Sequence, residues 1–433
     1  MCTGPLQWSK GLGGATDEEG NFVAIDPSGN ILLGGYFTSP IDAGCGMMMP
    51  GGGDTPFLIK YSAIGACIWS KAFPISQVGT TDQVKGVATD SLGNIYISGT
   101  FFGGVDLGGG MMVATGTSDV FMAKFKPNGA FVWGKRFGNV SPQTGKALSV
   151  DAQGNVFLVG DFYGQVDFGG GSMVSVGNTD IYAAKFDTNG NYLWAKRFGD
   201  VAGQTAVSVA ADSAGNMVFT GTLNGAADFG GGLLTSAGLG DIFVAKLDGA
   251  GNHLWSKRFG DAADQVGSGI AVNALNDVIV TGHVAGGTVS FGGQNLVNQG
   301  GDDAFLVQLD PAGNHMWSRL GGGPGNQSGL GVAVDPTGNV VMTGLLASTA
   351  DFGGGVLTSA GLADIVVARY DGTGAHIWSK VFGDPAYQFA RSVAAAPNGD
   401  SIVAGLTLGS VDFGGGPVAG AGGEDIFLLR FGP

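Results

Sequence analysis

Residues 252–260 read NHLWSKRFG, and residues 130–138 read AFVWGKRFG. The tryptophan at the centre of this pattern recurs at steps of 61 to 64 residues, at Trp8, Trp69, Trp133, Trp194, Trp255, Trp317 and Trp378. A fixed period of this length indicates a supersecondary unit that must pack on its neighbours to bury its apolar faces. The chain therefore contains seven copies of one unit.

Each unit is predicted to be a four-stranded antiparallel meander. Residues 145–198 contain four short runs rich in Val, Phe, Tyr and Ala, at 147–150, 155–161, 180–186 and 191–198. Between the runs, segments such as DAQG at 151–154 place Asp first and Gly fourth in a tight turn. DPSG at 26–29 adds a Pro whose fixed φ suits a type I turn. No helical periodicity or capping box interrupts this pattern.

The two ends of the chain predict how the units are closed. The last unit stops at its third strand, residues 425–431, and the missing tryptophan strand is found at residues 6–10. A split unit of this kind is typical of a circular β-propeller, in which blade packs on blade and protects the sheet edges. We therefore predict an all-β fold, a single seven-bladed β-propeller domain over residues 1–433, closed three plus one by the N-terminal strand. Its blades are expected at about 20–73, 84–137, 145–198, 206–259, 267–320, 329–382 and 390–431 plus 5–12.

Composition limits the classes of function. The chain has 44% apolar and 13% charged residues, a core-forming balance, and its 84 glycines fall at turns and in a recurrent DFGGG loop. A net charge of −15 at pH 7 argues against binding to nucleic acid or to an anionic membrane surface. No segment approaches the length of a membrane span. We expect a monomer without a cofactor or a bound metal.

Residues 241–260, DIFVAKLDGAGNHLWSKRFG, and their copies resemble the β-propeller repeat of the bacterial cell-surface proteins called SBBP, and the resemblance covers the whole chain. That family is predominantly exported, and most of its members have no assigned biochemical role. The resemblance therefore implies an extracellular or cell-surface location, with a signal peptide removed from the mature chain. Cys2, directly after Met1, is then a candidate for the lipidated first residue of a lipoprotein.

Two further cysteines fall in one blade. Cys45 lies in the loop between the second and third strands, and Cys67 lies two residues before Trp69. Two alternatives stay open for them: a disulfide, or two unrelated thiols in a small-residue loop and a strand. A disulfide would contribute roughly 3 kcal/mol through loop closure and would indicate an oxidising compartment.

Comparison of the seven units reveals a matched acid and base. With the strands of a unit called A to D, the acid lies in the B–C loop and the base eighteen residues later on strand C. The matched residues are Asp42 with Lys60, Asp106 with Lys124, Asp167 with Lys185, Asp228 with Lys246, Asp351 with Arg369 and Asp412 with Arg430. The remaining blade has Ser290 and Gln308 instead. Because one member alone would leave a charge in a low dielectric, the matched loss predicts structural ion pairs within each blade.

A second repeated set precedes the innermost strand of each blade. It comprises one acid and six amides, Glu18, Gln83, Gln143, Gln204, Gln265, Gln327 and Gln388. We expect these side chains to ring one mouth of the central channel. There they either bind a metal or substrate, or tie adjacent D–A loops together. A separate acid opens strand C, for example Asp180, and is expected to accept backbone N–H bonds from a loop.

Catalysis requires residues that break the sevenfold pattern, and few do. Glu occurs only at positions 18, 19 and 424, so a paired-carboxylate site has little to draw on. Three of the four histidines share one position on strand D, and His283 is singular. We therefore predict no catalytic residue. A propeller enzyme of the hydrolase, lyase or quinoprotein type is the alternative, with Asp161 and His283 near the channel as its polar resources.

The favoured function is a non-enzymatic binding or scaffold module that recognises an unidentified protein or glycan through the loops of one face. Blades 1 to 3 carry Phe37, Phe102 and Tyr163 after strand B, where the later blades have Asn224, Ala285, Ala347 and Leu408. Exposed aromatic rings on adjacent blades would form a docking strip. The alternative is that the rings pack beneath neighbouring loops, and solvent exposure distinguishes the two.

Overall fold

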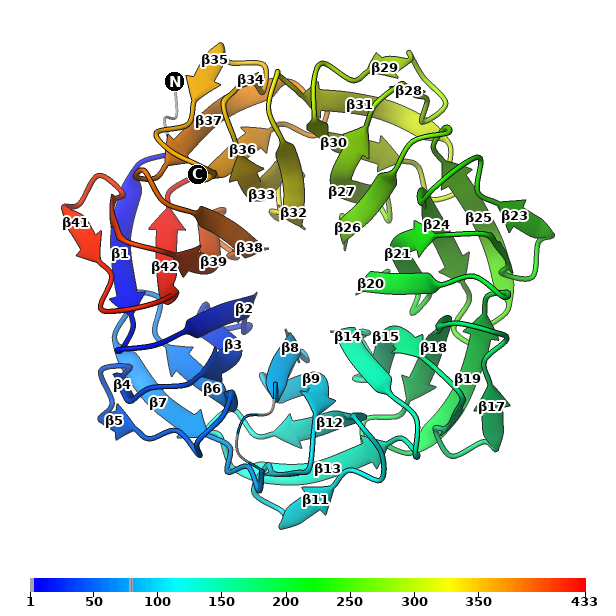
Figure 1. Ribbon diagram of the computed structural model, residues 1–433, viewed down its shortest axis with the longest axis vertical. Coiled ribbons are helices and arrows are strands. Elements are labelled where there is room, and N and C mark those ends of the chain that lie inside the picture. Colours follow the sequence, from blue (N-terminus) through cyan, green and yellow to red (C-terminus); the bar gives the residue numbers. More distant parts are fainter. Residues whose placement is uncertain (1–3, 78, 80) are drawn as a thin grey trace. The chain divides into compact units, whose positions relative to one another are not determined.

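The computed structural model describes residues 4–77, 79 and 81–433. These residues form seven four-stranded antiparallel sheets and seven two-stranded hairpins (Figure 1). The predicted all-β, seven-bladed β-propeller class is confirmed. The chain divides into two compact units, the first with residues 1–23, 236–243 and 257–433 and the second with residues 24–235 and 244–256. The single domain over residues 1–433 stays a prediction.

Each four-stranded sheet contains one strand of each kind, A to D. Strand A is β2 (Glu18–Ile25), β8 (Gln83–Thr89), β14 (Gln143–Val150), β20 (Gln204–Ala211), β26 (Gln265–Val272), β32 (Gln327–Val334) or β38 (Gln388–Ala395). Strand B is β3 (Ile31–Phe37), β9 (Ile95–Phe101), β15 (Val156–Phe162), β21 (Met217–Leu223), β27 (Val278–Ala285), β33 (Val340–Leu346) or β39 (Ser401–Thr407). Strand C is β6 (Thr55–Tyr61), β12 (Asp119–Phe125), β18 (Asp180–Phe186), β24 (Asp241–Leu247), β30 (Asp302–Leu309), β36 (Asp364–Tyr370) or β42 (Asp425–Phe431). Strand D is β7 (Cys67–Ala72), β13 (Phe131–Phe137), β19 (Tyr192–Phe198), β25 (His253–Phe259), β31 (His315–Gly321), β37 (His376–Phe382) or β1 (Leu6–Leu12).

A small hairpin lies between strands B and C of each sheet in the described residues. The hairpins are β4 (Ile41–Asp42) with β5 (Met47–Met48), β10 (Gly104–Asp106) with β11 (Met111–Val113), β16 (Gln165–Asp167) with β17 (Ser172–Val174), β22 (Ala226–Asp228) with β23 (Leu233–Thr235), β28 (Thr288–Val289) with β29 (Leu296–Val297), β34 (Thr349–Asp351) with β35 (Val356–Thr358), and β40 (Ser410–Asp412) with β41 (Pro417–Ala419).

Burial explains the composition of the strands. In the second unit, β9 and β12 are buried along their whole length, whereas β13 buries only its last residue fully. Strands B and C consist of nearly continuous apolar and small residues because both of their faces are covered. One core cluster joins two consecutive sheets of this unit, with Tyr96 and Met122 from one and Leu158 and Phe186 from the next. These two sheets therefore share one core.

The split blade is completed within the first unit. Strand β1 pairs antiparallel with β42, with Trp8 opposite Arg430 and Leu12 opposite Ile426, and the sheet continues through β39 to β38. Figure 1 shows the N-terminal strand, in dark blue, beside the C-terminal strand, in red. The predicted three-plus-one closure is confirmed.

A disulfide joins Cys45 in the B–C loop to Cys67 at the start of β7, with Cα atoms 5.6 Å apart. The alternative of two unrelated thiols is therefore wrong. The same two positions are in contact in other blades, where a loop glycine lies against the ring that opens strand D. These contacts are Gly109 with Phe131, Gly170 with Tyr192, Gly231 with His253, Gly293 with His315, and Gly354 with His376. The proposed lipidation site Cys2 lies outside the described residues.

Candidate functional site

The predicted ion pairs are wrong in their choice of acid. Lys185 Nζ lies 3.2 Å from Asp151 Oδ2, in the turn between strands A and B, and both side chains are buried. The same arrangement joins Lys60 to Asp26, Lys124 to Asp90, Lys246 to Asp212, Arg369 to Asp335 and Arg430 to Asp400. Burial raises the pKa of Asp26, but hydrogen bonds from Lys60 and Asn30 outweigh it and leave this pKa below its ordinary value.

The B–C loop acids hold their own loop instead. Asp167 is exposed, and its Oδ1 accepts the N–H groups of Gly169 and Gly171 at 2.7 and 3.1 Å. The same two bonds are made by Asp42, Asp106, Asp228, Asp351 and Asp412. A short acid side chain readily accepts backbone N–H bonds from the residues that follow it in a turn. These acids therefore act as loop caps and are not the partners of the strand C bases.

The blade that lacks both residues shows that the two roles are separate. Ser290 Oγ accepts the N–H of Gly292 at 3.3 Å and so replaces the loop acid. Gln308 Nε2 donates to Asp277 Oδ2 at 2.9 Å and so replaces the base at the A–B turn. Two local replacements, and not one lost ion pair, account for the matched change.

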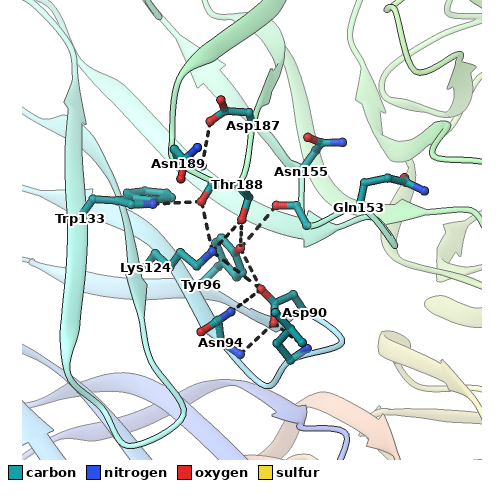
Figure 2. A network of polar contacts seen from close by, with 12 residues as sticks. Asp90, Asn94, Tyr96, Lys124, Trp133, Gln153, Asn155, Asp187, Thr188 and Asn189 are labelled. Carbon is teal, nitrogen blue, oxygen red and sulfur yellow. Dashed lines mark hydrogen bonds and ion pairs between the residues drawn. The ribbon is translucent and has the colours of Figure 1, made fainter.

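Figure 2 shows how one of these pairs fastens a blade to the next. Lys124 Nζ donates to Thr188 Oγ1 at 2.7 Å, and Trp133 Nε1 donates to the Thr188 carbonyl at 3.2 Å. The Tyr96 hydroxyl lies 3.1 Å from both Asp90 Oδ2 and Thr188 Oγ1. Burial lowers the pKa of Lys124 and raises that of Tyr96. Because Lys124, Tyr96 and Trp133 all contact Thr188 of the next blade, we assign this network a structural role.

The residues predicted to ring a channel mouth begin strand A. Gln204 Oε1 accepts the N–H of Asp200 at 3.1 Å, and its Nε2 donates to the Asn224 carbonyl, also at 3.1 Å. Gln143, Gln265 and Gln388 bind the equivalent loops, Glu18 and Gln327 are also buried, and Gln83 is half-buried. These contacts match the alternative in which the side chains tie the D–A loops. Their binding of a metal or substrate stays a prediction.

The predicted aromatic strip of Phe37, Phe102 and Tyr163 is wrong for Phe37. Phe37 is the last residue of β3 and is fully buried, in register with Phe101 and Phe162 at the ends of β9 and β15. Each of these rings precedes its B–C loop acid by five residues, so counting back from the acid would have given the register. Phe102 is half-buried, and Tyr163 is 47% exposed. Of the three predicted rings, Tyr163 is the one that solvent reaches freely.

Tyr163 lies on one of several adjoining loops of the second unit that carry exposed apolar residues. Its N–H donates to the carbonyl of Pro142, in the loop that carries Val140, at 3.1 Å. The residue after Tyr163 accepts a hydrogen bond from the residue before Val176, and the loop that follows packs on Val201. Val140 is 78%, Val176 43% and Val201 74% exposed. We call these residues the loop-face patch: Val140, Tyr163, Val176 and Val201.

The singular histidine lies in a polar cluster of the first unit. His283 Nδ1 lies 3.1 Å from Ser328 Oγ on β32, and His283 Nε2 lies 4.0 Å from Asp302 Oδ2 at the start of β30. Ser328 is 7% exposed and the Asp302 side chain 37%. Sequence reasoning found the histidine because it breaks the repeat, but it missed the serine and the acid, which lie on other strands.

The second singular residue has an equivalent contact in the second unit. Asp161 Oδ2 accepts the hydroxyl of Thr205 at 2.7 Å and lies 3.6 Å from Lys146 Nζ. Thr205 and Ser328 are both the second residue of a strand A. A polar residue near the end of strand B therefore meets a hydroxyl group of the following blade in both places.

The acids that open strand C accept loop N–H groups, as predicted. Asp180 Oδ2 accepts the N–H of Val176 at 3.0 Å and contacts Arg197 Nη1, and Asp364 accepts the N–H of Ala360. Burial raises the pKa of Asp180, Asp303, Asp364 and Asp425. These carboxyl groups hold the entry to strand C and are too deeply buried to meet a ligand.

A groove elsewhere in the second unit has polar side chains that are already paired with protein groups. An open groove of about 650 Å³ is lined by Lys196, Arg197, Asp228, Asn252 and His253 among others, but Arg197 is paired with Asp180 and His253 with Ser256.

Within residues 4–77, 79 and 81–433, no three or more His, Cys, Asp or Glu side chains are grouped so as to hold a metal ion. No helix in that same part of the chain has the length and apolarity needed to cross a membrane.

The fold places the chain among the β-propeller proteins. Residues 75–100 match the SBBP family, described as a beta-propeller repeat, so the resemblance seen in the sequence is confirmed over this segment. An uncharacterized WD repeat-containing protein of Acanthamoeba polyphaga mimivirus is 26% identical over 361 residues, covering 66% of this chain and 26% of that protein. Regulatory protein FlaEY of Caulobacter vibrioides is 26% identical over 242 residues, covering 51% and 25%. The chain thus spans about a quarter of the length of these relatives.

One solved propeller domain is similar to this chain in fold. The WD40 β-propeller domain of Doa1 has a TM-score of 0.50 at 12% identity, with 98% of this chain and 96% of that domain covered. The WD40 domain of Neurospora crassa Pan2 has a TM-score of 0.48 at 10% identity, with 96% and 90% covered. At these identities the likeness to Doa1 shows the fold alone.

Proposed function

We propose that this protein is a non-enzymatic binding module of an exported bacterial surface protein, and that it recognises a protein or a glycan through the loop-face patch. The disulfide between Cys45 and Cys67 supports a location in an oxidising compartment. The SBBP match at residues 75–100 supports the same location, since that family is predominantly exported. The net charge of −15 favours a partner that is not itself strongly acidic.

The observation that carries this proposal is the exposure of Tyr163 together with three aliphatic side chains. They come from separate loops, yet backbone bonds and loop packing join those loops. Between 43% and 78% of each side chain remains in solvent, so burial in the core does not account for them. A tyrosine amid exposed apolar groups suits a sugar ring or an apolar protein side chain, because its hydroxyl stays hydrated while its ring is covered.

Replacement of Tyr163 by Ala is expected to weaken binding of the partner at least about tenfold, as truncation of a central aromatic contact does. The measurement starts with a glycan array and a display library of surface proteins, and then determines the Kd of each hit by calorimetry. Leu193→Ala is the matched control, because Leu193 is also 47% exposed but lies on strand β19 outside the patch. Hits that bind Tyr163→Ala with unchanged Kd, or that lose affinity only with Leu193→Ala, would contradict the proposal.

A second candidate function is hydrolysis of an ester, favoured by the cluster of His283, Ser328 and Asp302. A serine hydroxyl 3.1 Å from one imidazole nitrogen, with a carboxylate oxygen 4.0 Å from the other, supplies the groups from which an activated nucleophile is built. The Ser328 Oγ would attack the ester carbonyl carbon while its proton moves to His283 Nδ1. The histidine would then return that proton to the departing alcohol, which leaves the acyl group on Ser328 Oγ. A water molecule would next attack this acyl carbonyl carbon while His283 takes its proton, and return of that proton to Ser328 Oγ would release the carboxylic acid and restore the serine.

Under this second function, a fluorophosphonate probe is expected to add to Ser328 and to raise the intact mass of the protein by one adduct. Ser328→Ala should abolish the adduct and lower the hydrolysis rate of p-nitrophenyl acetate roughly a hundredfold or more. Thr205→Ala is the control, since its hydroxyl takes the same place on strand A beside Asp161. An unlabelled wild-type protein, or equal rates in both variants, would remove the enzyme from consideration.

A further inference from the structure

The three glutamates of the chain lie close together at one junction of the first unit. The loop at residues 13–17, between β1 and β2, packs on the loop at residues 420–424, before β42. Glu18 N donates to the Glu424 carbonyl at 2.7 Å, and Glu424 N donates to Asp17 Oδ1 at 3.1 Å. We call these two loops the closure seam, because one leads out of the N-terminal strand and the other leads into the C-terminal strand that pairs with it.

The closure seam is crowded with carboxyl groups. Arg391 of β38 faces them, and its Nη2 lies 3.1 Å from Glu19 Oε1. The carboxyl groups that interact with one another here are those of Asp17, Glu19, Glu424 and Asp425. Glu18 Oε2 is occupied by the N–H of Gly14 at 2.8 Å. One guanidinium therefore serves a group of acids that would repel one another if all were ionised.

Two of these acids are in direct contact. Glu424 forms a side-chain hydrogen bond with Glu19, and a bond between two carboxyl groups requires that one of them keep its proton. Burial, followed by this bond and the charge of Glu19, raises the pKa of Glu424 to about 7. The blade itself does not need an acid at this place. Thr179 and Ala363 stand at the same position, where their carbonyls accept the first N–H of the next strand A.

We propose that the closure seam is a pH-sensitive latch, held when Glu424 and Glu19 share one proton and loosened when both are ionised. Loss of the shared proton places a second charge beside Glu19 and Asp17. The bonds from Glu18 N to Glu424 and from Glu424 N to Asp17 then join two loops that repel each other. Opening would begin at these loops, which lie next to the pairing of β1 with β42.

The direction of the pH effect follows from proton counts. The native protein holds a proton on Glu424 up to about pH 7, whereas the unfolded chain releases it near 4.5. Between these values the native state binds more protons, so the stability from this group is full below about pH 4.5 and is lost as pH rises to about 7. Above pH 7 this group adds no further pH dependence.

Hydrogen exchange of the full-length chain and its thermal unfolding, both measured from pH 5 to pH 8, test the latch. For the wild type, we expect protection of residues 13–17 and 420–424, corrected for intrinsic exchange rates, to fall about tenfold across this range. In Glu424→Gln, which keeps a donor to Glu19 but cannot ionise, protection should stay constant. Asp310→Asn is the control, because Asp310 lies in a turn and its pKa is lowered by the Asn314 hydrogen bonds, which outweigh burial.

Glu19→Gln provides an independent check, since it removes the charge that raises the Glu424 pKa. It too should flatten the pH dependence. If Glu424→Gln loses protection as the wild type does, or if protection in the wild type does not change between pH 5 and pH 8, the latch is disproved. Should Glu424→Gln fail to fold, two other measurements decide. The latch is disproved if Glu19→Gln keeps the pH dependence of the wild type, or if a carbon-13 titration shows all three wild-type glutamates titrating near 4.5.

Discussion

Removal of residues 1–12 is expected to lower the midpoint of thermal unfolding by on the order of 10 °C and to cause aggregation. This deletion removes β1, whose residues from Leu6 to Leu12 pair with β42. Strand β42 is buried along its whole length, so its Phe427 and Leu429 side chains and its free backbone edge would become exposed. Differential scanning calorimetry and light scattering on the shortened chain measure both effects.

A deletion of residues 1–3 is the control, because it spares β1 and the carbonyl of Gly4, which accepts a bond from Lys380 Nζ at 2.7 Å. A synthetic peptide of residues 4–12 should restore most of the lost stability when added to the shortened protein. A protein without residues 1–12 that melts with the full chain would mean that β1 does not hold the split blade together.

Replacement of Lys185 by Met is expected to destabilise the protein by about 3 kcal/mol or more, because it leaves the buried carboxylate of Asp151 without its cation. Asp151→Asn should be costly as well, since Lys185 would keep the carbonyls of Gly215 and Gly249 and the ring of Phe157 but would lose the carboxylate of Asp151. The double variant should cost less than the sum of the two by about 1 kcal/mol or more. Urea unfolding of the four proteins gives this coupling free energy.

The same experiment separates the observed pair from the one predicted from the sequence. Asp167→Ser should cost less than about 1 kcal/mol, because Asp167 is exposed and a serine can cap the loop as Ser290 does. Its effect should add to that of Lys185→Met without coupling. Coupling of Lys185 to Asp167 in place of Asp151 would contradict the geometry of the A–B turn.

The fold could be predicted because its signals are local and repeated. Tryptophan marks strand D in every unit, and tight-turn sequences mark the ends of the strands, so the blade count and the closure by β1 followed from counting. Contacts between strands were harder to foresee. Acids recur in both the A–B turn and the B–C loop, and spacing along the chain does not say which of them strand C faces. The joint occurrence of Ser290 and Gln308 in place of the acid and the base suggested a contact between these positions, but two separate local replacements explain it better.

The candidate site was partly foreseen for a related reason. Tyr163 was found because it breaks the repeat, but Phe37 was matched to the wrong position by one residue. That one residue separates the buried end of strand B, where Phe37 lies, from the loop after it, where Tyr163 lies. The aliphatic members of the loop-face patch carry no sequence signal, since valine is common in every blade. Ser328 and Asp302 became visible only when strand pairing placed them beside His283.

The contact between the B–C loop and the first residue of strand D has a consequence for how such repeats can diversify. A phenyl ring, a phenol, an imidazole and a cysteine side chain occupy the same place in different blades, and the cysteine is joined by a disulfide to a second cysteine in the loop. Because the scaffold already holds both positions in contact, a covalent cross-link needs only two cysteines and no change of backbone. Each such place is therefore a ready attachment point for an engineered tether or probe, remote from the inner strands and open to oxidants in the medium.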